Sequence, residues 1–157
     1  MVFTICREPR IRSDQVVTQP RLEETLMYEP MRTSSNLSRN KQTVLRYLDG
    51  YRGPDHEQIL STLTDDIRWT IFGAARLHGK AEYDANIEGP EFVGAPEIRI
   101  VRLIEENDVV MGELTVEVRR ITGESMRAAM GEVFVMRDGL IAERRAYVIE
   151  LTENDYK

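Results

Sequence analysis

Cysteine and histidine are scarce in this chain of 157 residues. Cys6 is the only cysteine, so the chain can form no internal disulfide and no thiolate cluster for zinc or iron–sulfur. The two histidines, His56 and His78, lie far apart and form neither an HxxxH nor an HExxH motif. A glycine-rich phosphate loop and a dinucleotide fingerprint are also missing, so we expect no metal and no cofactor.

Long apolar runs and an excess of basic charge are missing as well. No stretch approaches the roughly 18 apolar residues that a membrane helix needs. The apolar start, residues 1–6, meets Arg7 too early to form the core of a signal peptide. The 21 Lys and Arg against 27 Asp and Glu give a net charge of −6, which argues against nucleic acid and acidic membranes as partners. The sequence therefore predicts a cytoplasmic protein that binds neither.

What is present fits one domain and an N-terminal extension. With 41% apolar and 31% charged residues, the chain has the composition of a soluble globular protein and the length of one domain. Residues 1–38 hold three of the six prolines and none of the ten glycines. Their last part, RTSSNLS, is typical of a linker. We interpret residues 1–38 as an extension that is partly flexible or docks, and residues 39–157 as the domain.

The first half of this domain predicts three helices and one strand. Ser38 is a suitable N-cap for a first helix, whose apolar residues recur every three to four positions. Pro54 suits the first position of a second helix. The alternating, β-branched run at 66–73 predicts a strand, and a third helix is expected at about 80–88.

The second half predicts four consecutive strands. The tight turn at Asp138-Gly139 is typical of a hairpin. The expected strands are 97–106, 109–121, 125–136 and 140–151. This order of elements predicts an α+β domain in which three helices cover one face of an antiparallel sheet.

Two runs of the chain carry a family resemblance. They are VLRYLDGYRGPDHEQILSTLTDDIRWTIFG and FVMRDGLIAERRAYVI, and they resemble the opening and the last hairpin of the nuclear-transport-factor-2-like superfamily, in its SnoaL-like and ketosteroid-isomerase-like branch. The resemblance covers about residues 39–151. It implies a cone-shaped, strongly bent sheet with an apolar pocket, usually in a homodimer.

The same resemblance implies a function for that pocket. Its ligand would be a small, mostly apolar, carbonyl-bearing molecule, and its chemistry a proton transfer of the isomerase, cyclase or dehydratase type. A non-catalytic small-molecule-binding module or a protein-binding dimerisation module is the alternative, because this fold carries many unrelated functions.

The resemblance also carries roles onto individual positions. The ketosteroid-isomerase tyrosine that donates to the substrate oxyanion falls on Tyr47, and the protonated acid that is the second donor falls on Glu132. The general base, an aspartate in that family, falls on Ile71, which cannot accept a proton. The water-holding pair of limonene epoxide hydrolase falls on Trp69 and Ile71, and an acid–base aspartate falls on Ala146, so we do not expect an epoxide hydrolase.

The polar candidates each have a structural interpretation beside the functional one. Tyr47 is either a core tyrosine or the oxyanion donor. Glu132 shares a strand face with apolar residues, so its carboxyl is either paired with an arginine or neutral and able to donate. Arg144 either anchors a substrate carboxylate or pairs with Glu132 or Glu113. His78, in a loop before Gly79, is either a base or a surface residue.

The strand at 109–121 has two possible orientations. By alternation, its apolar residues Leu114, Val116 and Val118 form the buried face. The family register instead turns Glu113, Thr115 and Glu117 toward the cavity. We follow the family register, in which Glu113 replaces the base that is missing at Ile71.

These arguments give the candidate site. The catalytic candidates are Tyr47, Glu132, Glu113, Arg144 and His78. Apolar residues and one threonine are expected to line the cavity, although the same residues would also serve as ordinary core. These lining residues are Trp69, Ile71, Phe92, Met111, Thr115, Met130, Phe134, Ala146 and Val148.

Overall fold

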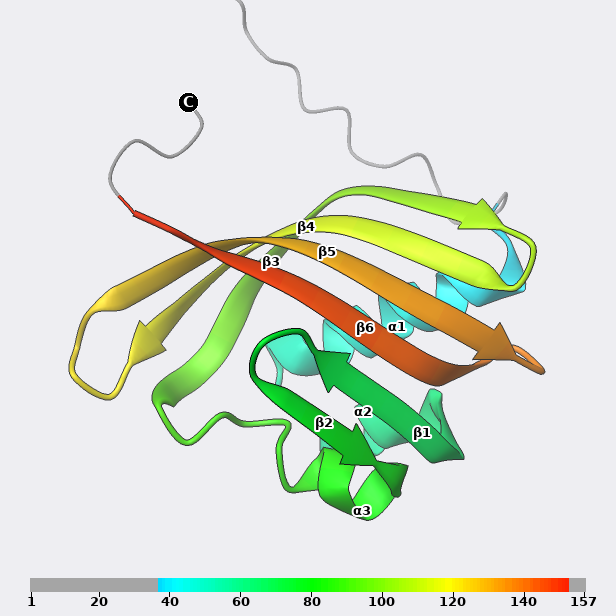
Figure 1. Ribbon diagram of the computed structural model, residues 1–157, viewed down its shortest axis with the longest axis horizontal. Helices are drawn as coiled ribbons and strands as arrows, with labels where there is room; N and C mark the ends of the chain where they lie inside the picture. Colours follow the sequence, from blue (N-terminus) through cyan, green and yellow to red (C-terminus); the bar gives the residue numbers. More distant parts are fainter. Residues whose placement is uncertain (1–36, 153–157) are drawn as a thin grey trace, which may run out of the picture. The chain divides into compact units, whose positions relative to one another are not determined.

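The computed structural model describes residues 37–152, which are coloured along the chain in Figure 1. The predicted extension, residues 1–38, therefore lies outside the described residues except for its last two positions. The elements follow in the order α1 (Arg39–Arg52), α2 (His56–Ser61), β1 (Leu63–Ile71), β2 (Ala75–His78), α3 (Gly79–Asp84), β3 (Phe92–Glu106), β4 (Val109–Arg120), β5 (Ser125–Arg137) and β6 (Leu140–Leu151).

Side-chain caps set the starts of the first two helices. Ser38 Oγ accepts a hydrogen bond from the backbone N–H of Lys41 at 3.1 Å, so the predicted cap of α1 is confirmed. Asp55 accepts from the N–H of Gln58 at 2.8 Å. This cap explains why α2 begins at His56. The sequence had predicted a start at Pro54, two residues earlier.

The strands form one mixed, six-stranded sheet in the order β2-β1-β6-β5-β4-β3. Neighbouring strands are antiparallel except β1 and β6, which are parallel, so the expected all-antiparallel sheet has one parallel junction. The short strand β2 was not predicted, and β3 starts at Phe92, earlier than expected. Register shifts within β3 mark bulges, which bend a strand. The α+β architecture with a bent sheet and helices on one side is confirmed (Figure 1).

The two faces of the sheet differ in burial. We call the face that packs on the helices the inner face and the opposite one the outer face. Residues of both layers form the core on the inner face: Val44, Tyr47, Leu48, Ile59, Leu63, Ile67, Trp69, Tyr83, Ile87, Val110, Leu114, Phe134, Met136 and Ile141. None of the helices within residues 37–152 is long and apolar enough to cross a membrane.

The orientation of β4 corrects one expectation. Val110, Leu114 and Val118 are buried on the inner face, whereas Glu113 and Thr115 are exposed on the outer face. The family register that we followed for this strand was therefore wrong. The apolar alternation decides the orientation, because a strand buries the face that removes more apolar surface from water.

Candidate functional site

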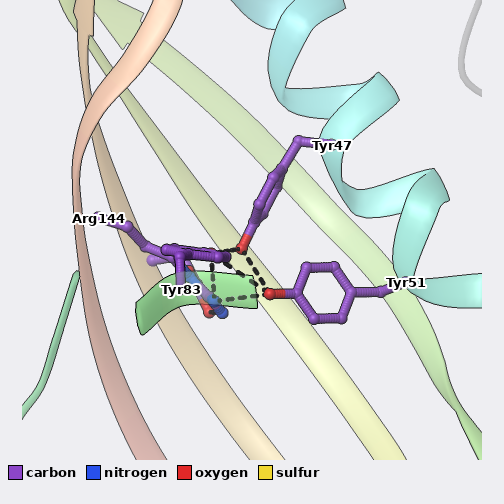
Figure 2. Close-up of polar contacts among 5 residues, drawn as sticks. Tyr47, Tyr51, Tyr83 and Arg144 are labelled. Carbon is purple, nitrogen blue, oxygen red and sulfur yellow. Dashed lines mark hydrogen bonds and ion pairs between the residues drawn. The ribbon is translucent and has the colours of Figure 1, made fainter. Parts of the chain in front are cut away.

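A polar cluster lies inside the apolar core, on the inner face of the sheet. It consists of Tyr47 and Tyr51 from α1, Tyr83 from α3, Glu132 from β5 and Arg144 from β6, and we call these five residues the tyrosine–arginine cluster. Figure 2 shows the three tyrosines pointing toward one another and toward Arg144. Elements from both ends of the described chain thus converge on one point.

The three tyrosine hydroxyls form a triangle of hydrogen bonds. Tyr47 and Tyr51 are one helical turn apart, so their side chains project from the same face of α1. The hydroxyl of Tyr47 lies 2.5 Å from that of Tyr83 and 3.2 Å from that of Tyr51. The third side, between Tyr51 and Tyr83, measures 3.3 Å. Tyr47 and Tyr83 are buried, while Tyr51 is half-buried.

Arg144 connects this triangle to Glu132. Its Nε and Nη2 donate to the two carboxylate oxygens of Glu132, each at 2.5 Å. Its Nη1 donates to the hydroxyls of Tyr83 at 3.1 Å and Tyr51 at 3.4 Å. Arg144 is 7% exposed and Glu132 is 0% exposed, and charges this deeply buried persist only when they are paired. The two-point contact is that of an ionised carboxylate, which decides between the two interpretations of Glu132.

Trp69 covers the guanidinium from the neighbouring strand. In the β1–β6 register Trp69 lies beside Arg144, and its ring centroid is 4.3 Å from the Arg144 Cζ. The same indole packs on the ring of Tyr83 at 4.8 Å between centroids. A cation over an aromatic face is attracted by the ring, so Trp69 helps to hold Arg144 charged and in place.

Burial and charge set the protonation of the cluster. Burial raises the pKa of Tyr47 and of Tyr83 well above the usual 10, although the positive charge of Arg144 opposes this shift. Burial alone would lower the pKa of Arg144, but the Glu132 carboxylate and the three tyrosines together outweigh it, and the pKa lies well above its usual value. The two hydroxyls therefore stay protonated donors beside a permanent positive charge.

Apolar residues lie next to the cluster on the inner face. Ile71 pairs with Ala146, which lies opposite Glu132, and Met130 pairs with Val148 in the next row of the sheet. Exposure rises along β6 from 1% at Ala146 to 42% at Val148, and Ile71 and Met130 are half-buried. An apolar surface thus extends from the buried cluster toward solvent. A separate hollow of about 280 Å³ at the β1–β2 turn is lined by residues 70–76 and includes none of the cluster residues.

The structure brings many of the predicted site residues together. Tyr47, Glu132 and Arg144 form the cluster, and the predicted lining residues Trp69, Phe134, Ala146, Ile71, Met130 and Val148 lie beside them on the inner face. The Tyr47 ring packs edge-on against Phe134 with centroids 5.6 Å apart. Whether these residues bind a ligand stays a prediction.

Other predicted residues lie elsewhere. Glu113 is exposed and pairs with Arg102 at 2.9 Å on the outer face, where Met111 and Thr115 are also exposed, so placing these three inside the cavity was wrong. His78 is exposed at the end of β2, and its backbone N–H donates to Glu82. Phe92 lies half-buried at the start of β3, beside the guanidinium of Arg120.

Two members of the cluster were not among the predicted site residues. Tyr51 has the four-residue spacing from Tyr47 that places both on one helix face, so the sequence contained a signal for it. Tyr83 has no such signal, because only the chain path through β2 brings α3 to α1. Within residues 37–152, no group of three or more His, Cys, Asp or Glu side chains is arranged to hold a metal ion. The expected lack of a cofactor and the cytoplasmic location stay predictions.

Comparisons with known proteins agree with this architecture. Residues 44–144 match a family described as SnoaL-like domain. No curated protein matches the chain. Among solved structures, an NTF2-like protein of unknown function from Burkholderia pseudomallei has a TM-score of 0.66 at 20% identity, covering 71% of this chain and 91% of that one.

Two further solved structures are similar at comparable distance. An LEH-like epoxide hydrolase from M. tuberculosis has a TM-score of 0.63 at 19% identity, covering 71% of this chain and 83% of that one. TerC, crystallised with polyporic acid, has a TM-score of 0.63 at 24% identity, covering 70% of this chain and 91% of that one. Identities this low show only that the fold is shared, so the ligand of this chain has to be inferred from its own side chains.

Proposed function

The chain belongs to the SnoaL-like domain family, and from its tyrosine–arginine cluster we propose that it binds a small, mostly apolar molecule through one oxygen that carries or acquires negative charge. One observation carries this proposal. Three hydroxyls within 2.5–3.3 Å of one another lie beside the buried, charged Nη1 of Arg144. Preorganised donors beside a fixed charge, screened from water, stabilise an anionic oxygen strongly.

The geometry favours a single oxygen over a carboxylate. The two-nitrogen edge of Arg144 that would hold a carboxylate is already occupied by Glu132. Only Nη1 faces the tyrosines, and it is shared between Tyr83 and Tyr51. A phenolate or an enolate offers one charged oxygen on an apolar body, and the half-buried Ile71 and Met130 offer apolar contacts for that body.

The same donors would stabilise an enolate formed by loss of a proton next to a carbonyl. Such an isomerase, cyclase or dehydratase reaction also needs a base. Within the cluster the only carboxylate is Glu132, and both of its oxygens are bonded to Arg144, while the family's base position holds Ile71. This observation favours a second candidate, a binding module that takes up an already anionic molecule and performs no proton transfer.

Similar proteins support the ligand class without defining it. TerC is a relative in fold that was crystallised with polyporic acid, a small organic molecule. The LEH-like epoxide hydrolase is another, but we do not expect its activity in this chain, because the positions carried over from limonene epoxide hydrolase hold Trp69, Ile71 and Ala146.

We propose further that two copies of the chain pair through the outer face, which exposes Phe72, Met111, Tyr147 and Ile149.

Fluorescence of Trp69, the only tryptophan, tests the binding proposal. A series of phenols of increasing acidity is titrated into the wild type, into Tyr47→Phe and into the outer-face control Tyr147→Phe. We expect affinity to rise with acidity and to fall about 5- to 30-fold in Tyr47→Phe only. An affinity that depends neither on the acidity of the phenol nor on the Tyr47 hydroxyl would contradict an oxyanion site.

Exchange of deuterium from an α-deuterated ketone, followed by NMR, separates an enzyme from a binding module.

A further inference from the structure

Trp69 holds a buried hydrogen-bond donor that no described residue satisfies. Its indole Nε1 is inaccessible, and no acceptor from residues 37–152 lies within bonding distance. The residue as a whole is only 8% exposed. Buried polar groups are almost always paired in native proteins, so each exception calls for a physical reason.

The unpaired donor lies beside the tyrosine–arginine cluster. The indole contacts two members of that cluster, with 4.3 Å from its ring centroid to the Arg144 Cζ and 4.8 Å to the Tyr83 ring. Arg144 and Tyr83 both bond to the hydroxyl triangle, so the indole that carries the unpaired N–H is a direct neighbour of the proposed anion site. By contrast, each hydroxyl of the cluster already has a hydrogen-bond partner.

We infer that the indole N–H of Trp69 donates to a second oxygen of the molecule that the cluster binds. This inference rests on the proposed function, since the first oxygen is the anionic one held by the tyrosines and Arg144. Trp69 is uncharged and donates once, which suits a neutral acceptor such as a ketone oxygen. The ligand class becomes an apolar molecule with two oxygens of different character, such as a hydroxyaryl ketone or the enolate of a diketone.

Discrimination between ligands follows from this assignment. A molecule that lacks the second oxygen leaves the indole donor unpaired in the complex, whereas one that has it gains a buried hydrogen bond. Trp69 is therefore a specificity-determining residue, separate from the anion-binding role of Tyr47 and Arg144.

The test compares 3- and 4-hydroxyacetophenone with 3- and 4-ethylphenol, which keep the ring and lose the ketone oxygen. Because the chain has one tryptophan, its 15N-labelled form gives one indole N–H signal in an NMR spectrum. We expect at least one hydroxyacetophenone to move this indole proton downfield, and neither ethylphenol to do so. Calorimetry gives the ratio of ketone to ethyl affinity, and Trp69→Phe should reduce that ratio about five- to tenfold.

Comparing this ratio between the wild type and Trp69→Phe cancels the different acidity of the phenols and any effect of the substitution that both ligand types share. An indole signal that responds equally to both ligand types, together with an unchanged affinity ratio, overturns the inference about Trp69. The proposed function survives that result as long as phenol binding still depends on Tyr47. If none of the four compounds binds, the proposed function fails, and the inference fails with it. The NMR measurement uses the wild type, so it decides even if Trp69→Phe does not fold.

Discussion

Arg144 and Glu132 form a buried ion pair in which two guanidinium nitrogens each lie 2.5 Å from a carboxylate oxygen. Their side chains are 8% and 0% exposed. Removing two charges from water is costly, and their mutual contact, the tyrosine hydroxyls and the Trp69 ring compensate for that cost. The pair therefore fixes the guanidinium against Trp69 and the tyrosines. We expect loss of the pair to lower both the free energy of unfolding and the affinity for the ligand.

The first prediction concerns Glu132→Gln, which removes the negative charge and keeps the shape. The guanidinium of Arg144 would then be buried without a counter-charge, and we expect the free energy of unfolding to fall by about 3 kcal/mol. Urea unfolding followed by circular dichroism measures this difference.

Glu113→Gln is the matched control for this change. Glu113 forms the same type of pair with Arg102 at 2.9 Å, but both side chains are more than half exposed. An exposed pair contributes about 0–1 kcal/mol, so we expect little change. Equal losses in the two variants would contradict the role assigned to the buried pair.

The hairpin of β5 and β6 shows how much of this pair the sequence could predict. The tight turn at Asp138-Gly139 was predicted, and both residues have the positive φ that such a turn requires. A regular hairpin from that turn would place Glu132 opposite Arg145. The observed register shifts by one residue between Val135 and Met136, so Glu132 lies opposite Ala146 and Arg144 takes the inner face. A one-residue bulge leaves no clear pattern in the sequence.

The local parts of the site can be predicted from the sequence, whereas the long-range contacts cannot. The cap at Ser38 and the spacing of Tyr47 and Tyr51 depend on neighbours within one or two helical turns, and such features can be predicted from the sequence. The meeting of Tyr83 with these tyrosines depends on β2, whose four residues are too few for a recognisable period. The error at Glu113 arose where a family register was preferred over the apolar alternation of the strand itself.

The second prediction concerns alkaline pH. Burial raises the pKa of Tyr47 and Tyr83 above the value of 10 that a tyrosine has in the unfolded chain. Above pH 10 the folded state thus binds more protons than the unfolded state, and stability must fall as the pH rises. We expect these two tyrosines to ionise only as the protein unfolds, which absorbance at 295 nm and circular dichroism follow together. Tyrosine ionisation completed before any unfolding would contradict the burial of the cluster, and Tyr147→Phe is the exposed control.

The third prediction concerns the contact between α2 and α3. His56 Nδ1 lies 2.6 Å from Asp84 Oδ1, and this hydrogen bond is the main reason that the pKa of His56 is raised from 6.5. Glu88, 3.9 Å from Nε2, adds to the shift. Because the pKa of His56 is raised on folding, its protonated form stabilises the fold fully below pH 6.5. This contribution is lost as the pH rises through the pKa that His56 has in the folded state. Because His56 is 39% exposed, we expect less than about 1 kcal/mol.

Asp84→Asn should remove most of this pH dependence when urea unfolding is measured on both sides of neutrality. Asp49→Asn, which removes an exposed carboxylate paired with Arg52, is the control. A pH dependence that is the same in wild type and Asp84→Asn would show that the histidine contact does not stabilise α3.

The fourth prediction concerns two glycines at the end of α1. A Cβ on Gly50 would lie 2.6 Å from Cγ1 of Ile59, a fully buried side chain of α2. We expect Gly50→Ala to lose about 1–3 kcal/mol of stability through this overlap. A Cβ on Gly53 meets nothing within 4 Å, and its φ of −122° suits any residue. Gly53→Ala should therefore be neutral or slightly stabilising, and equal thermal shifts in the two variants would contradict the close packing of α1 on α2.

The fifth prediction concerns pairing of two copies through the outer face. Phe72 and Tyr147 stack there with ring centroids 4.5 Å apart, yet they remain 49% and 46% exposed. Ile149 is 66% exposed on the same face. Several exposed apolar residues on one sheet face are costly in water, and a second copy would cover them. We expect sedimentation velocity to find a dimer for the wild type and a monomer for Ile149→Lys.

Ile121→Lys is the matched control, because Ile121 is equally exposed at 66% but lies in the turn after β4. It should leave the dimer intact. The tyrosine–arginine cluster lies within one chain, so the Ile149→Lys monomer should still bind phenols through Tyr47. A monomeric wild type would contradict the proposed pairing. A dimer that persists in Ile149→Lys but is lost in Ile121→Lys would show that the interface lies at the β4–β5 turn. Loss of phenol binding together with the dimer would mean that the partner copy helps to form the site.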